Sequence, residues 1–146
     1  MSKPGGRVAT PIRHQGTLID VVIKPVGSLL SGTKVRGLID TGSDFVLISP
    51  SIAHTLGLRH VDNDVVGGIG GEEIGAKVYS GCVTVPELNF ERALPLYAVD
   101  WSPTSHTVLL GRSFLKFFVF RYDGPSELFH FSSPLDSSYH PSDDDG

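Results

Sequence analysis

An acidic turn between two apolar runs is the feature that most constrains how this chain can fold. The stretch Val35–Ile48 places Asp40, Thr41, Gly42 and Ser43 between two segments with strand-like composition. A carboxylate beside buried segments is costly unless hydrogen bonds satisfy it. The Thr41 hydroxyl, the Gly42 N–H and the Ser43 hydroxyl could supply those bonds. The pattern predicts two strands joined by a tight turn, with Asp40 as a candidate acid or base.

Short apolar runs separated by turn formers indicate an all-β domain. The chain has 17 Gly and 10 Pro in 146 residues, and they fall between these runs, as turn residues do between short strands. A polar turn is expected at Asp62–Asp64. Two short helices are expected, one starting at Pro50 with Ser49 as its N-cap and one at Phe114–Phe118. The expected strands include Thr17–Ile23, Thr33–Ile39, Phe45–Ile48, Leu94–Val99, Val108–Leu110, Val119–Tyr122 and Leu128–Phe131.

Composition divides the chain into three parts. Residues 1–13 are expected to be a flexible N-terminal segment, residues 14–132 the folded domain, and residues 133–146 a disordered acidic tail. The net charge of −4 offers no polybasic surface for nucleic acid. No apolar run approaches the roughly 20 residues of a membrane span. The single Cys82 cannot form an internal disulfide, which favours a reducing compartment and a cytoplasmic location.

Two further motifs accompany the acidic turn. The stretch Gly67–Gly71 joins two apolar segments and predicts a β-hairpin with a glycine-rich tip, and Val108–Arg112 reads apolar-apolar-apolar-Gly-Arg. With the turn Asp40–Ser43, they resemble the flap tip, the Gly-Arg segment and the active-site turn of retropepsin-like aspartic proteases. The three occur in the family's order, and the resemblance covers Gly16–Phe131. It implies a single-lobe, closed β-barrel with a flap hairpin and one or two short helices.

The resemblance implies an aspartic endopeptidase that needs two copies of the chain. In this family one carboxylate activates a water molecule while the other protonates the carbonyl oxygen of the peptide bond. The chain has one Asp-Thr-Gly and no internal repeat, so a homodimer would pair Asp40 with its counterpart. Thr41 would hydrogen-bond across the dimer axis, and Gly42 would present its carbonyl to a peptide or protein substrate. No metal or organic cofactor is required.

The same resemblance implies how substrate is held. Asp44 would anchor the substrate main chain and pair with Arg112 in a buried ion pair, and Gly111 would support the turn. The flap around Ile69 would close on an extended substrate, and the pockets would favour apolar residues beside the cleaved bond. The implied substrate-binding residues are Leu38, Ser43, Asp44, Leu47, Val66, Gly68, Ile69, Gly70 and Leu109.

Two departures and several alternatives remain open at this stage. Retroviral enzymes usually carry Ala where this chain has Ser43, and a hydroxyl bonded to the ionised Asp40 would favour an acidic optimum. The terminal strands that hold family dimers have no obvious match, and the hairpin Val119–Phe131 could take their place. The main alternative is a catalytically silent dimerisation or peptide-binding module, and another is a domain that releases itself from a precursor. A serine or cysteine hydrolase is disfavoured because Cys82 has no basic neighbour in sequence and no Gly-x-Ser-x-Gly motif occurs.

Overall fold

The computed structural model describes residues 7–11, 16–67, 71–100 and 107–133, and their architecture is all-β, as predicted. Two short α-helices and one 3₁₀ helix, η2, interrupt the strands. The elements are β1 Arg7–Pro11, β2 Leu18–Lys24, β3 Thr33–Ile39, β4 Val46–Ile48, α1 Pro50–Thr55, β5 Arg59–Gly67, β6 Glu73–Val85, η2 Pro86–Leu88, β7 Phe90–Ala98, β8 Thr107–Leu110, α2 Arg112–Leu115, β9 Val119–Asp123 and β10 Leu128–Ser132.

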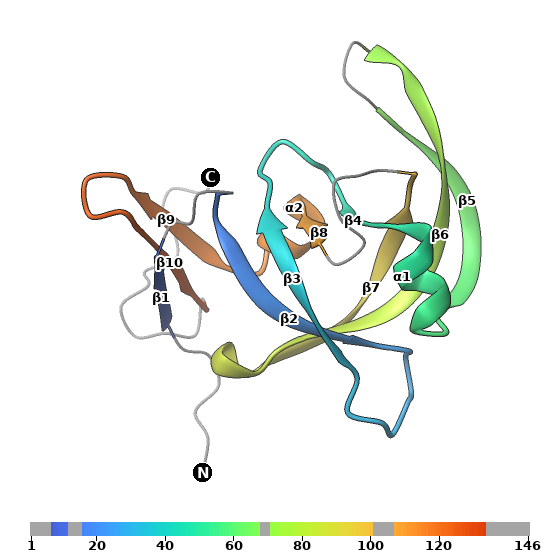
Figure 1. The fold of residues 1–146 in the computed structure, drawn as a ribbon, viewed down its shortest axis with the longest axis horizontal. Coiled ribbons are helices and arrows are strands. Elements are labelled where there is room, and N and C mark those ends of the chain that lie inside the picture. Colours follow the sequence, from blue (N-terminus) through green and yellow to red (C-terminus); the bar gives the residue numbers. More distant parts are fainter. Residues whose placement is uncertain (1–6, 12–15, 68–70, 101–106, 134–146) are drawn as a thin grey trace, which may run out of the picture.

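Six strands close into a barrel (Figure 1). Their order is β2-β3-β8-β4-β7-β6, and β6 pairs again with β2 to complete the ring. Most pairs are antiparallel, but β3–β8 and β4–β7 are parallel. The two parallel pairs flank the turn that joins β3 to β4, so strands from both halves of the chain hold this turn.

Strands β5 and β6 form the long hairpin that the sequence predicted, and its far end projects beyond the barrel (Figure 1). The end of the hairpin and the turn after β3 lie on the same side of the molecule, at the top of that view. The polar turn expected at Asp62–Asp64 is wrong, because these residues continue β5 and pair with β6. A bulge between His60 and Asp62 shifts the register instead. The glycine tip, residues 68–70, lies outside the described residues.

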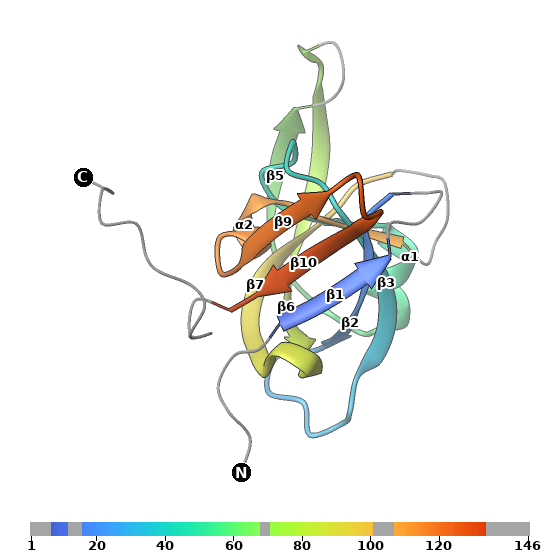
Figure 2. The same ribbon diagram turned by 90° about the vertical axis from the view of Figure 1, so that its left-hand side faces the viewer.

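A separate three-stranded antiparallel sheet has the order β1-β10-β9 and lies beside the barrel (Figure 2). The expected flexible segment 1–13 is wrong for Arg7–Pro11, which pair with β10 from Arg7↔Ser132 to Pro11↔Leu128. Backbone pairing with β10 forms this strand, and its five residues are too short and too mixed in composition to indicate a strand by themselves. The predicted hairpin Val119–Phe131 is present as β9 and β10. Except for the buried Ser133, the tail 133–146 lies outside the described residues.

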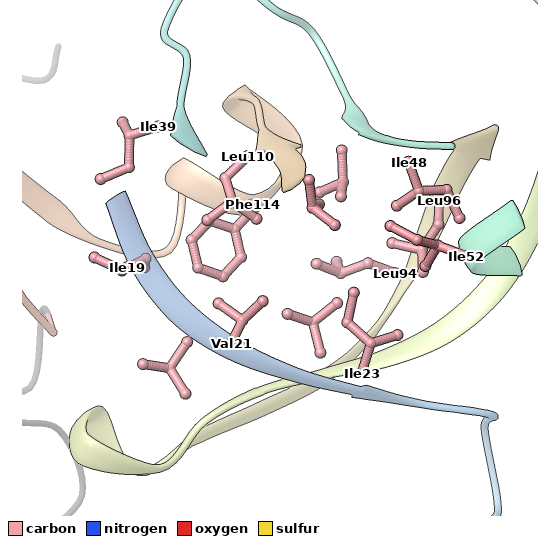
Figure 3. Packing of buried hydrophobic residues seen from close by; sticks show 14 of the residues in the cluster. Ile19, Val21, Ile23, Ile39, Ile48, Ile52, Leu94, Leu96, Leu110 and Phe114 are labelled. Atoms are coloured by element: carbon pink, nitrogen blue, oxygen red, sulfur yellow. The ribbon is translucent and has the colours of Figure 1, made fainter. Parts of the chain in front are cut away.

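The core is a continuous cluster of aliphatic and phenylalanine side chains that fills the barrel (Figure 3) and extends to Phe129 and Phe131 of β10 in the second sheet. Phe114 from α2 is fully buried there beside Leu110. Helix α1 has the predicted N-cap, since Ser49 Oγ accepts the Ile52 N–H at 3.3 Å. Helix α2 begins at Arg112, two residues earlier than expected, with Gly111 as its N-cap. None of the helices in the described part of the chain has the length and apolar character to cross a membrane.

Candidate active site

The turn after β3 holds Asp40 through backbone groups. Asp40 donates its N–H to the Leu110 carbonyl at 3.1 Å, and its own carbonyl accepts the Ser43 N–H at 3.2 Å. The Gly42 N–H donates to Asp40 Oδ1 at 3.0 Å. The side chain is only partly buried, and within the described residues no other side-chain hydrogen bond engages its second oxygen, Oδ2. The turn therefore fixes the carboxylate from one side and leaves its other face free.

The Ser43 hydroxyl does not contact the Asp40 carboxylate, contrary to the sequence-based expectation. Ser43 Oγ donates to the Phe45 carbonyl at 3.0 Å. Because this hydroxyl donates its proton to the Phe45 carbonyl, it closes the turn and adds no hydrogen bond to the Asp40 carboxylate. The geometric reason for attributing an acidic optimum to Ser43 is thus removed.

The segment after β8 packs directly behind this turn, as the sequence predicted. Arg112 N–H donates to the Ser43 carbonyl at 2.8 Å, and Ser113 N–H donates to the Asp44 carbonyl at 2.9 Å. A Cβ on Gly111 would lie 2.6 Å from the Ser43 carbonyl oxygen and closer still to that of Phe45. Only glycine permits this backbone approach.

The Arg112 side chain also binds the turn. One guanidinium nitrogen donates to the Thr41 carbonyl at 2.6 Å, and the other forms an ion pair with the Asp44 carboxylate. The predicted Asp44–Arg112 pairing is confirmed, but the expectation that the pair is buried is wrong for the isolated chain. The two side chains are 67% and 54% exposed, respectively, so the pair serves geometry more than stability.

A cavity of about 320 Å³ opens at Asp40 and Thr41. Leu38 lies in its wall, in agreement with the predicted location near the site. Phe120 and Tyr122 of β9 line the opposite side, and Tyr122 is 60% exposed. No sequence pattern indicated that β9 would lie near Asp40, because its position depends on the second sheet.

The other expected pocket residues gather around the turn and the hairpin. Leu47 on β4 pairs with Leu109 on β8, and both are partly buried. Leu47 and Val66 pack against a small cluster that includes Tyr97. Gly68, Ile69 and Gly70 lie outside the described residues. Phe45 was not among the predicted site residues, although it directly follows Asp44. Its ring stacks on Tyr97 with centroids 4.1 Å apart.

The turn carries two acidic side chains, Asp40 and Asp44. Asp44 is occupied by Arg112. Within the described ranges, no group of three or more His, Cys, Asp or Glu side chains could hold a metal ion. The arrangement leaves one partly exposed carboxylate, Asp40, in a hydrogen-bonded turn that lines the cavity.

Comparison with known proteins gives one family and two solved structures. A family model described as aspartyl protease matches residues 27–114. A retropepsin-like aspartic protease from Rickettsia conorii is similar in structure, with a TM-score of 0.59, 18% identity, and coverage of 91% of this chain and 97% of that one. EIAV protease complexed with the inhibitor HBY-793 has a TM-score of 0.50, 19% identity, and coverage of 68% and 85%. No curated protein matches the sequence.

Proposed function

The chain belongs to the aspartyl protease family, and we propose that it is a homodimeric endopeptidase whose active site pairs Asp40 of one protomer with Asp40 of its partner. One observation carries this proposal. A single, partly exposed Asp40 is held by the Gly42 N–H in a turn braced by Gly111 and Arg112, and its open face borders a cavity. Hydrolysis by this route needs a second carboxylate, which a second copy of the same turn would supply.

The chemistry follows from two carboxyl groups in contact. They cannot both ionise, so they hold one proton between them. The ionised carboxylate takes a proton from water as the water oxygen attacks the peptide carbonyl carbon. The protonated carboxyl gives its proton to the carbonyl oxygen, forming a tetrahedral diol. Collapse of this diol breaks the C–N bond, and the amine leaves with a proton.

Substrate binding is proposed to use the hairpin β5–β6 as a flap. An extended peptide would lie between the hairpin and the turn after β3, with Gly42 and Asp44 meeting its main chain. The partly buried side chains Leu38, Leu47, Val66 and Leu109 would border its side chains and favour apolar residues beside the cleaved bond. Ile69, between Gly68 and Gly70, would exclude water when the flap closes.

The dimer contact is proposed to involve β9. In the described part of the chain, β9 pairs only with β10, so its outer edge is free for another strand. Phe120 and Tyr122 on this strand line the cavity at Asp40, and the exposed Tyr122 offers apolar area. A partner that covers this edge would bring its own Asp40 turn toward the same cavity.

The catalytic test is cleavage of denatured casein between about pH 3 and pH 8, a range that brackets a shared-proton pair. Wild type should cleave, pepstatin should inhibit, and Asp40→Asn should lose at least about 10³-fold in rate because the variant cannot share the proton. Equal cleavage by wild type and Asp40→Asn would refute the mechanism. A well-folded dimer without activity would favour the silent binding module.

The dimer test compares Tyr122→Arg with Leu29→Arg. Leu29 is an apolar, fully exposed residue on the loop between β2 and β3, away from the turn at Asp40. Tyr122→Arg should shift dimer dissociation, measured by sedimentation, to higher protein concentration, and specific activity should fall in parallel. Leu29→Arg should change neither. Dimerisation unaffected by Tyr122→Arg would place the contact elsewhere.

A further inference from the structure

A small apolar cluster lies apart from the barrel core, where the flap hairpin meets the barrel. Its buried members are Ala76 and Val78 on β6, Tyr97 on β7, and Val99. Phe45, Leu47 and Val66 pack against it with partly buried side chains. The cluster therefore combines residues from the segment after the Asp40 turn with residues from both strands of the hairpin.

Tyr97 is the member that contacts both parts directly. Its ring stacks on Phe45 at an interplanar angle of 11°, with centroids 4.1 Å apart. Its hydroxyl donates to Asp64 Oδ2 at 3.3 Å. Asp64 lies on β5, opposite Ala76 of β6 in the hairpin. One side chain thus joins the exit of the Asp40 turn to the outer strand of the hairpin.

Both ends of this contact are held in place by further bonds. The Phe45 carbonyl accepts the Ser43 hydroxyl at 3.0 Å, which ties Phe45 to the turn. Asp64 Oδ1 accepts the Val65 N–H at 2.8 Å, so its other oxygen is the one directed to Tyr97. These bonds hold the Phe45 backbone against the turn and fix the Asp64 carboxylate independently of Tyr97.

Tyr97 suits this role because it is almost fully buried while its hydroxyl reaches a charged acceptor. The residue is 8% exposed, and a hydroxyl removed from water needs a partner. Burial and the negative charge of Asp64 raise the pKa of Tyr97, which keeps the hydroxyl protonated as a donor. Any movement of β5 away from the barrel must break this bond, because β7 is part of the closed barrel.

We propose that Tyr97 is a positioning residue that fixes the flap hairpin relative to the Asp40 turn, through its stack on Phe45 and its hydrogen bond to Asp64. The inference rests on the proposed function. The hydrogen bond holds the hairpin in the orientation that receives substrate, so its loss weakens substrate binding in the ground state and the transition state alike. It does not change the chemistry at Asp40.

The test compares Tyr97→Phe, Asp64→Ala and the double variant. Tyr97→Phe keeps the stacked ring, and the Asp64 carboxylate left behind is exposed to water, so the fold should persist. Each single variant should raise KM for a peptide substrate about fivefold, the equivalent of roughly one hydrogen bond, with kcat within about twofold. The double variant should be no worse than either single variant, because both remove the same contact.

Tyr79→Phe is the matched control. Tyr79 lies on β6 of the hairpin, whereas Tyr97 is on β7, and the Tyr79 ring packs against His60 and the main core. Its KM should stay at the wild-type value. An unchanged KM in Tyr97→Phe, additive effects in the double variant, or a fall in kcat with unchanged KM would each overturn the proposal.

Hydrogen exchange separates this proposal from the proposed function. In Tyr97→Phe, the amides of β5 and β6 between the Tyr97–Asp64 contact and the far end of the hairpin should exchange about fivefold faster. The amides of β9 and β10 should keep their rates. Faster exchange confined to the hairpin would support the positioning role even in a chain without peptidase activity. Unchanged exchange in the hairpin would refute it whatever the activity.

Discussion

Replacing Gly111 with alanine tests whether the close approach behind the Asp40 turn is essential. An alanine Cβ would lie 2.6 Å from the Ser43 carbonyl oxygen and closer to that of Phe45. Both atoms belong to the backbone, so no side-chain rotation can relieve the overlap. The turn must move away from the segment after β8.

The expected cost has two parts. Forcing an extra methyl into a close-packed position costs about 1–3 kcal/mol. Moving the turn also strains the hydrogen bonds from Arg112 N–H to Ser43 and from Ser113 N–H to Asp44, 2.8 and 2.9 Å long, each contributing about 0.5–1.5 kcal/mol. Together they predict a loss of about 2–6 kcal/mol in the free energy of unfolding. Displacement of Asp40 by about 1 Å should lower kcat/KM roughly 100-fold.

The assay is urea unfolding of Gly111→Ala together with casein cleavage. Gly75→Ala is the stability control, because a Cβ there meets no atom within 4 Å and should change stability by less than about 0.5 kcal/mol. Because a folded domain has only about 5–15 kcal/mol of stability, activity should be measured below the unfolding transition. Wild-type stability and activity in Gly111→Ala would show that the turn does not depend on this approach.

Three further predictions concern the core, the turn and the thiol. Phe114→Ala should destabilise the protein by about 3–5 kcal/mol in urea unfolding, because the ring is fully buried, and a loss below about 1 kcal/mol would contradict this packing. Arg112→Lys should lower kcat/KM about tenfold, because lysine can replace only one of the two guanidinium contacts. The stability should change by less than about 1 kcal/mol, because the ion pair is exposed. Unchanged activity would oppose the bracing role. Burial raises the pKa of the Cys82 thiol, so less thiolate forms near neutral pH. Labelling of Cys82 in the folded protein should therefore be slower than in urea and begin at higher pH. Equal rates would show that the thiol is accessible.

The sequence was sufficient where local chemistry decides the structure. The N-cap Ser49, the turn at Asp40 and the pairing of Asp44 with Arg112 were all predicted, and each is present. The Asp44–Arg112 pair is the exception to local chemistry, because its partners are separated by 68 residues. It was predicted from the resemblance of the motifs to a known family. Glycine at position 111 marked the close approach because no other residue would fit.

Features that depend on pairing between distant strands escaped prediction. The turn expected at Asp62–Asp64 is strand because β6 supplies backbone bonds to residues whose side chains are exposed on both faces, so no apolar alternation marks it. Arg7–Pro11 likewise forms β1 through its backbone pairing with the distant strand β10. The contacts of Tyr97 with Phe45 and Asp64 join three separate segments of the chain. No local sequence pattern indicates that these segments meet.

The Asp40 turn is held by β8 and Arg112, which are synthesised later than the turn itself. The protein should therefore become active only after this later segment has been made. The bond from Arg112 to Thr41 spans 71 residues, which take about 4–14 s to add at typical rates of protein synthesis. Until that segment has left the ribosome, the Asp40 turn lacks both its brace and the carbonyl that receives its N–H. We therefore expect the nascent chain to be inactive until this segment has emerged, and we expect a truncation before residue 112 to lack activity although the Asp-Thr-Gly sequence is intact.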